Sequence, residues 1–356
     1  MMAGRGLGHT DGTIYKLESI PGFRTDLSMT EFSDNVSRIG AAIIAPGGSM
    51  VLADKRMYAL RDVTGTVTSL PLQTSSIMSK KLAENPDSLV LDVKFGRSAF
   101  QKTSKESIEL AKSLIAAGEL GGVKVGAFVT RMDCPIGAAV GNWLEVKECI
   151  HILRSGRGSE DLINLCIVEA AQMLVQSGAV PSNSLSEGID MARRNLSNGR
   201  AFDKFRSMVV AQGGDVSGVE NLESHPQKPI FEIDICVDAE GRRYLSGIDA
   251  LEVGYTAIDI RAGRTSPDSE IDMTAGIWFY KKVGDQVEAG DKVATIYGNK
   301  EDAVKAAADR VRRAIEFSVK KVDVPPLITH FVTKDSVEEF DIWILSERAY
   351  LQLYIN

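Results

Sequence analysis

The pattern of apolar positions along the chain changes several times, and each change predicts an element. Continuous apolar runs at 38–48, 88–96 and 123–133 are typical of short buried strands. Between and after the last two runs, apolar residues recur at helical spacing over 104–118 and 136–154. This alternation of strand and helix predicts βαβ units whose parallel strands are buried on both faces.

Helical periodicity also marks the segment 53–83 and most of 159–212. We expect Asp54 to cap a helix in the first segment and Pro71 to begin or kink the helix that follows. That helix should end at Asn85-Pro86, because a proline disfavours helical backbone in the residue before it.

The character of the chain changes near Lys228. Residues 228–248 alternate around a tight Ala-Glu-Gly turn and predict an antiparallel hairpin. The stretch 276–298 indicates a further β segment with two Gly-Asp turns, and 301–318 predicts a helix. The tail at 336–356 matches no element.

These patterns predict an α/β fold followed by a second, smaller domain. We expect residues 1–225 to form a central parallel-type sheet flanked by helices. Residues 226–335 should form a C-terminal α+β domain with antiparallel hairpins, and residues 336–356 a tail.

Composition narrows the class of protein. The chain has 356 residues, of which 44% are hydrophobic and 25% are charged, as in ordinary soluble globular proteins. Its net charge of -7 argues against a nucleic-acid partner, because phosphate backbones need clustered lysine and arginine. A small phosphate-bearing ligand is still compatible with this charge. The sequence has no signal core and no apolar run of ~18 residues, so we expect a cytoplasmic protein with no membrane partner.

The cysteines show no C-x-x-C spacing. We therefore expect buried thiols in a reducing compartment rather than disulfides or a metal site. The four cysteines are Cys134, Cys149, Cys166 and Cys236.

A glycine-rich stretch, GRGLGHTDGT, opens the chain at residues 4–13. Its glycines could bring backbone N–H groups close to an anion, and Thr13 adds a hydroxyl group. The stretch does not match the dinucleotide pattern G-x-G-x-x-G, and no predicted strand precedes it. A tight structural turn is the alternative interpretation.

Arg61, Ser76 and Lys80 form a second candidate group. Ser76 and Lys80 are four residues apart on a predicted helix, so their side chains share a face. A serine, a lysine and an arginine that converge suit a planar ring with carbonyl oxygens, such as a pyrimidine. The alternative is a solvated basic face.

The third candidate group is LDVKFGRSAF, residues 91–100. Asp92 and Lys94 point to the same side of a predicted strand, and ligands of α/β folds bind at the carboxyl ends of strands. Phe100 lies just beyond the strand and could pack against a ring. The alternative is a core strand with an internal ion pair.

Four segments carry a resemblance to a known family: GRGLGHTDGTIYKLESIPGF, ADKRMYALRDVTGTV, SKKLAENPDSLVLDVKFG and PIGAAVGNWLEVKE. They resemble thymidine phosphorylase and the wider pyrimidine-nucleoside phosphorylases, in order and at matching spacing, from Gly4 to about Thr333. The resemblance implies a pentosyltransferase of nucleoside salvage that converts thymidine and phosphate into thymine and 2-deoxyribose 1-phosphate. It also implies a homodimer with no organic cofactor, in which residues 53–83 are a remnant of a helical base-binding lobe.

The resemblance assigns roles residue by residue. The residues that it assigns to pyrimidine binding are Arg61, Ser76, Lys80, Tyr58, Leu7 and Phe100. It assigns phosphate binding to Thr13, and a potassium ion to Ile136, Ala139 and Glu148. Arg61 and Lys80 would stabilise the negative charge that develops on the departing base.

The sequence also departs from the family pattern. Ala3 stands where the family has a serine that binds phosphate, Asp11 replaces a glycine and Tyr15 replaces an aspartate. The charge of Asp11 opposes an approaching anion. A phosphate loop of the type K-x-S-T-G-G-x-G-D, the catalytic histidine and the N-terminal helices of the usual dimer interface occur nowhere in the sequence.

These departures predict a truncated form that is weak or inactive alone. One alternative is a non-catalytic homologue that binds a pyrimidine or pairs with a full-length subunit. Another is a related glycosyl- or phosphoribosyl-transferase that acts on a different base, although Arg61, Ser76 and Lys80 favour a pyrimidine.

Overall fold

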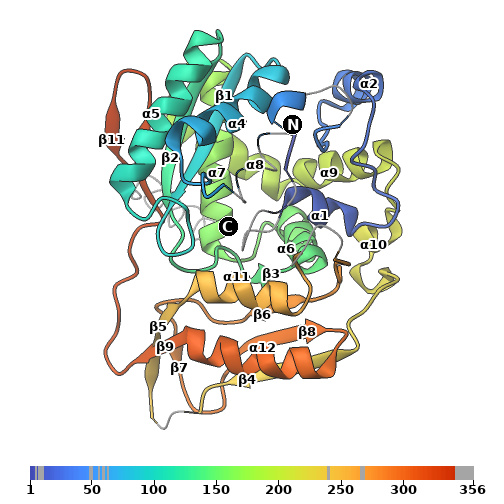
Figure 1. Cartoon of the computed structure of the whole chain (residues 1–356), viewed down its shortest axis with the longest axis vertical. Helices are drawn as coiled ribbons and strands as arrows, with labels where there is room; N and C mark the ends of the chain where they lie inside the picture. The colour runs from blue at the N-terminus through green and yellow to red at the C-terminus, as the bar shows by residue number, and fades with distance from the viewer. Residues whose placement is uncertain are drawn as a thin grey trace. The chain divides into compact units, whose positions relative to one another are not determined.

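The computed structural model divides the chain into two compact units, each built from three separate segments (Figure 1). Unit 1 comprises Met1–Gly47, Asp133–Ser159 and Gly199–Pro325, and unit 2 comprises Gly48–Met132, Glu160–Asn198 and Pro326–Asn356. Within these bounds the structure describes residues 1–4, 6, 12–47, 51–54, 57, 61, 64–238, 241–264 and 269–340.

Unit 2 contains a four-stranded sheet with the order β1-β2-β10-β11. Strands β1 (Ser88–Phe95) and β2 (Lys124–Arg131) are parallel, which confirms the prediction from their apolar runs. Strand β10 (Ile328–Val332) pairs antiparallel with both β2 and β11 (Val337–Glu339). Strand β11 falls in the tail for which no element was expected, because a three-residue edge strand is too short to show a period.

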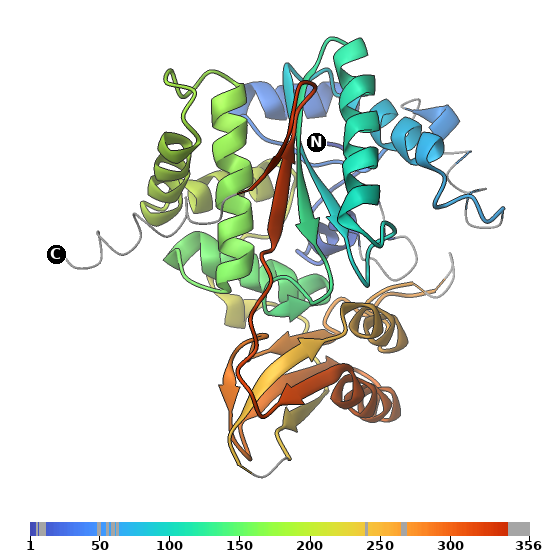
Figure 2. The same cartoon turned by 90° about the vertical axis from the view of Figure 1, so that its left-hand side faces the viewer.

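Helices cover both faces of this sheet. Figure 2 shows α5 on one side of β1 and β2 and α7 on the other. The apolar face of α5 packs on Val93, Val125 and Val129 of the two strands. The helices of unit 2 include α4 (Leu70–Ala83), α5 (Ser104–Leu120), α7 (Glu160–Gln176) and α8 (Leu185–Ser197).

In unit 1, Trp143 and Ile150 of α6 pack with Leu17 of α1 and Val209 of α9. Helix α2 begins with a capping box between Ser28 and Glu31. The helices of this part are α1 (Thr13–Glu18), α2 (Met29–Ile39), α6 (Asn142–Ser155), α9 (Arg200–Ala211), α10 (Ser217–Glu220) and the 3-10 turn Leu222–Ser224.

The prediction of a strand at 38–48 is wrong. Among the described residues 38–47, only Ile44 forms a β-bridge, with Met2. A side chain takes the place of a second strand: Gln212 Oε1 accepts the N–H of Ile43 at 3.0 Å, and Gln212 Nε2 donates to the carbonyl of Ile43 at 2.9 Å. These bonds satisfy the backbone of Ile43, while the N–H of Ile44 donates to the carbonyl of Met1 and its carbonyl accepts from Ala3.

The rest of unit 1 holds two small antiparallel sheets, with the orders β3-β6-β8-β4 and β7-β5-β9. Their strands are β3 (Ala139–Val140), β4 (Phe231–Cys236), β5 (Arg243–Ile248), β6 (Gly276–Phe279), β7 (Gln286–Val287), β8 (Lys292–Gly298) and β9 (Ile315–Ser318). Helices α11 (Ala250–Asp259) and α12 (Glu301–Ala314) pack against a shared apolar core.

Two predictions for this region need correction. Strands β4 and β5 do not form the expected hairpin, because β4 pairs with β8 while β5 pairs with β7 and β9. Alternation specifies which face of a strand is buried, not which strand lies beside it. The helix expected over 301–318 ends at Ala314, and its last four residues form β9. The domain boundaries at 225 and 335 stay predictions.

In the described part of the chain, no helix is long and apolar enough to cross a membrane.

Each of the four cysteines is a thiol outside any disulfide. The expectation that these thiols are buried is wrong for Cys149, Cys166 and Cys236, which are exposed, and Cys134 is half-buried.

Candidate functional site

Helix α4 brings Ser76 and Lys80 together. Pro71 lies in the first turn of this helix, where its missing N–H costs nothing. One helical turn separates the two residues, and Lys80 Nζ donates to Ser76 Oγ at 3.0 Å and also to the Ser76 carbonyl. The expectation that their side chains share a face is therefore confirmed.

Asp54 completes this group. Its carboxylate accepts a hydrogen bond from Lys80 Nζ at 2.7 Å, and only 9% of the Asp54 side chain and 16% of the Lys80 side chain are exposed. The prediction that Asp54 caps a helix is wrong, because Asp54 itself lies within the helical residues 52–54 and its carboxylate bonds to Lys80. A buried pair of this kind holds both charges in place, because either charge alone would be costly to bury.

Arg61 contacts the N-terminal end of α4. Its Nη2 donates to the carbonyl of Val67 at 2.5 Å and its Nη1 to the carbonyl of Leu72 at 3.4 Å. Asp54 reaches Lys80 near the other end of the helix, so Asp54 and Arg61 contact the two ends of α4. The structure thus places Arg61 and the Ser76–Lys80 pair in one unit, on two segments joined by hydrogen bonds.

Phe100 lies in the loop that follows β1, with 38% of its surface exposed. The loop closes on itself, since Gly96 N–H donates to the carbonyl of Gln101 at 3.0 Å. Gln101 Nε2 also donates to Gln73 Oε1 on α4, at 2.8 Å. This amide pair, which the sequence analysis did not single out, ties the loop of Phe100 to the helix of Ser76 and Lys80. The other two residues of the predicted pyrimidine pocket, Leu7 and Tyr58, lie outside the described residues.

Asp92 and Lys94 form an internal ion pair on β1, as one of the two interpretations held. Thr130 of β2 donates to Asp92 and accepts from Lys94 at 3.0 Å. Glu169 of α7 faces this pair. Burial, and next the charge of Asp92, raise the pKa of Glu169 to about 8. The cluster is therefore a polar contact between the sheet and α7.

Thr13, the predicted phosphate ligand, is exposed at the start of the short helix α1 in unit 1. Ala3 is buried, and its N–H donates to the carbonyl of Ile44 at 2.9 Å. Tyr15 is buried beneath the guanidinium group of Arg264, at 4.9 Å from the ring centroid. Asp11 lies outside the described residues.

The three residues assigned to potassium meet at one loop of unit 1, which contains Ile136 and Ala139 and is contacted by Glu148. Glu148 of α6 is 4% exposed, and its two carboxylate oxygens accept the N–H groups of Ala138 and Ala139 at 2.8 and 2.9 Å. Lys282 Nζ donates to the carbonyls of Pro135 and Gly137, at 2.8 and 2.6 Å. The loop from Pro135 to Ala139 is thereby fixed from two sides.

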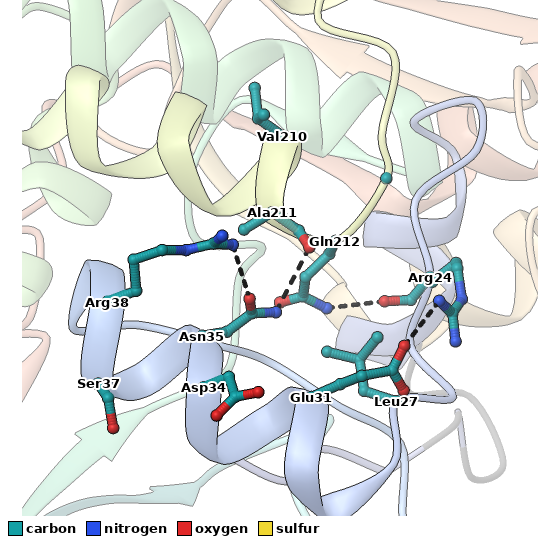
Figure 3. A pocket seen from close by; sticks show the side chains of 11 residues that line it. Arg24, Leu27, Glu31, Asp34, Asn35, Ser37, Arg38, Val210, Ala211 and Gln212 are labelled. Carbon is teal, nitrogen blue, oxygen red and sulfur yellow. Dashed lines mark hydrogen bonds and ion pairs between the residues drawn. The ribbon is translucent and has the colours of Figure 1, made fainter.

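A separate hollow of about 710 Å³ lies in unit 1 between α2 and the end of α9 (Figure 3). Four of its polar side chains are bonded in pairs: Arg24 to Glu31 at 3.0 Å, and Arg38 to Asn35 at 3.2 Å. Gln212 Nε2 donates to the carbonyl of Arg24 at 2.7 Å. None of the residues predicted for pyrimidine, phosphate or potassium lines this hollow.

Comparisons with known proteins agree with the resemblance seen in the sequence. Residues 1–202 match the family described as "Glycosyl transferase family, a/b domain", and residues 244–318 match the "Pyrimidine nucleoside phosphorylase C-terminal domain". Three curated relatives are all named pyrimidine-nucleoside phosphorylase.

The relative from Bacillus subtilis is 43% identical over 331 residues, which cover 92% of this chain and 75% of the relative. The Geobacillus stearothermophilus protein is 42% identical over 328 residues, covering 92% and 74%. The Staphylococcus haemolyticus protein is 40% identical over 333 residues, covering 94% and 75%. The chain therefore belongs to the pyrimidine-nucleoside phosphorylase family, whose members are glycosyltransferase-type enzymes.

Proposed function

We propose that this protein catalyses the phosphorolysis of pyrimidine nucleosides and that thymidine is a substrate. Phosphate would attack the anomeric carbon as the bond to the base breaks, which yields thymine and 2-deoxyribose 1-phosphate. The single observation that carries this proposal is the group on α4, where Lys80 bonds to Ser76 and to the buried Asp54. Membership of the family supports it.

Each residue of the group suits a pyrimidine. The base carries carbonyl oxygens and a ring N–H, and negative charge develops on it as it departs. The ammonium group of Lys80 and the guanidinium group of Arg61 supply donors and positive charge for those oxygens. The Ser76 hydroxyl both donates and accepts, so it can bond to either a carbonyl or the ring N–H. The buried carboxylate of Asp54 holds the ammonium group of Lys80 in place.

Phosphate and potassium belong to the same proposal. We assign the hydroxyl group of Thr13 to phosphate. The loop of Ile136 fits an alkali cation, because each oxygen of Glu148 accepts one N–H and keeps a further lone pair. Among the described residues, no hydrogen bond reaches the Ile136 carbonyl. A potassium ion held by Glu148 and the carbonyls of Ile136 and Ala139 would supply positive charge to this loop.

A second candidate function is pyrimidine binding without catalysis. Ala3 and Tyr15 favour it, because a methyl group donates no hydrogen bond to phosphate and Tyr15 packs beneath Arg264. Both functions use the same residues on α4 to bind the base. An activity assay therefore distinguishes the catalytic function from the binding function.

The test is phosphate-dependent cleavage of thymidine, followed by the absorbance change from nucleoside to base, with uridine in parallel. Lys80→Ala should abolish cleavage, whereas Lys81→Ala, the neighbouring lysine, should retain it. Because Lys80→Ala strands the buried Asp54 carboxylate, Ser76→Ala provides a second test, and the exposed Ser75→Ala is its control.

If cleavage is unchanged in Ser76→Ala, the assignment of Ser76 to pyrimidine binding is contradicted. A folded wild-type chain that cleaves neither nucleoside but binds thymine in calorimetry would establish the second function. A chain that neither cleaves a nucleoside nor binds a pyrimidine would overturn both.

A further inference from the structure

We propose that Gln73 and Gln101 form a positioning pair that holds Arg61 and the loop of Phe100 at the pyrimidine pocket. The proposal rests on the proposed function and names two residues that do not themselves touch the base. Both residues belong to unit 2, like the residues that they would position.

Gln73 is 6% exposed, and both ends of its amide group are used. Its Nε2 donates to the carbonyl of Val67 at 3.1 Å, and its Oε1 accepts from Gln101 Nε2 at 2.8 Å. A buried amide with partners on both sides has one orientation, because a flip would place like groups against each other.

The Val67 carbonyl is the point where Gln73 meets Arg61. It accepts from Arg61 Nη2 at 2.5 Å as well as from Gln73 Nε2, so its two lone pairs are both in use. Gln73 therefore fixes the direction of the carbonyl against which the guanidinium group of Arg61 is aligned. Without Gln73, the Val67 peptide loses one of the two bonds that orient it.

The other end of the pair acts on the loop of Phe100. Gln101 directly follows Phe100, forms a β-bridge with Phe95 and closes the loop through its carbonyl. Its side chain then bonds the loop to α4. The same amide contact thus links the orientation of Arg61 with the placement of Phe100.

This arrangement predicts a selective effect on the nucleoside. A shift of a positioning contact by about 1 Å can cost on the order of 10²-fold in rate, so a partial loosening should cost about 10-fold. We expect kcat/KM for thymidine to fall about 10-fold in Gln73→Met, while the KM for phosphate stays unchanged. Methionine keeps the volume of glutamine and removes the amide group.

The test is a double-mutant cycle with Gln73→Met, Gln101→Met and the double variant. The matched control is Gln172→Met on α7 of the same unit, which should retain wild-type kinetics. If the two residues act as one pair, the double variant loses no more than the worse single variant. Additive losses, an equal rise in the KM for phosphate, or unchanged kinetics would overturn the proposal.

A second readout does not depend on catalysis. In the unliganded protein, hydrogen exchange at the amides of Thr66 and Ser69, which flank Val67, should be several-fold faster in Gln73→Met than in wild type. Unchanged exchange would overturn the positioning pair even if the enzyme is active. The exchange could also be faster in a chain that neither cleaves nucleosides nor binds a pyrimidine. That result would support the contact between Gln73 and Val67 and would overturn only the proposed function.

Discussion

Lys80 donates to the buried carboxylate of Asp54, 26 positions earlier in the chain, across a distance of 2.7 Å. The contact joins the helix that carries Ser76 to the segment that leads to Arg61. It places an acidic partner beside the lysine that we assign to the base, so the stability of this region and the proposed pyrimidine site depend on the same pair.

The Asp54→Ala variant is expected to be about 3–5 kcal/mol less stable than wild type, because it leaves the charge of Lys80 buried without its carboxylate partner. Urea unfolding measures this difference. The exposed Asp87→Ala is the control and should change the free energy of unfolding by less than about 0.5 kcal/mol.

Adding Lys80→Met to Asp54→Ala should recover part of the lost stability, because the double variant buries no charge at this position. The role of the ion pair would be contradicted if the double variant has a lower free energy of unfolding than Asp54→Ala.

Glu169 should make the stability of the protein depend on pH. Its pKa is raised from the ordinary value of 4.5 to about 8, chiefly by burial and then by the charge of Asp92. Between these two pH values, the folded chain keeps a proton that the unfolded chain has released. The contribution of Glu169 to stability is therefore full below about pH 4.5 and is lost as the pH rises toward about 8.

The Glu169→Gln variant removes this titration. Its free energy of unfolding should fall less than that of wild type between about pH 5 and about pH 8, as measured by urea unfolding at several pH values. Glu160→Gln, an exposed substitution on the same helix, should retain the wild-type slope. Parallel pH profiles for wild type and Glu169→Gln would show that the group does not titrate in this range.

His225 is stacked on Trp143, with ring centroids 3.9 Å apart and planes inclined by 22°. It is 3% exposed, and its ring nitrogens lie 2.9 and 3.0 Å from the carbonyls of Gln227 and Ser19. The His225→Ala variant should lose about 3 kcal/mol, as for other truncations of buried rings. The exposed His151→Ala serves as the control in urea unfolding, and equal losses in both variants would contradict the expectation.

The elements that the sequence predicted well are those whose own burial sets their pattern. Strands β1 and β2 form a parallel pair in which β2 is buried and β1 is largely half-buried, and their apolar runs indicate both their position and their class. The pairing of β4 and β5 could not be predicted in this way. Their residues alternate as expected, but each strand pairs with a distant segment: β4 with β8, and β5 with β9.

The same distinction applies to the site. Ser76 and Lys80 are one helical turn apart, so the sequence alone indicated their contact. Asp54 and Lys80 are 26 positions apart, and Gln73 and Gln101 are 28 positions apart. No periodicity relates residues at such separations, and only the folded unit brings them into hydrogen-bond distance.

Gly141, the residue before α6, provides a final prediction because its backbone admits no side chain. Its φ of +129° is rarely adopted by other residues, and an added Cβ would lie 2.4 Å from the Ala275 carbonyl oxygen. Gly199 occupies the same position before α9, with a φ of +82° but open space around it. The pair compares a crowded glycine with an open one, both at a positive φ.

Gly199→Ala should cost only the strain of left-handed backbone, about 1–2 kcal/mol. Gly141→Ala should cost about 3–5 kcal/mol, because the strain and the overlap with the rigid backbone of Ala275 add together. Urea unfolding of the two variants measures both values under identical conditions. Equal losses would mean that the Ala275 backbone moves aside freely, which contradicts the close packing between the start of α6 and β6.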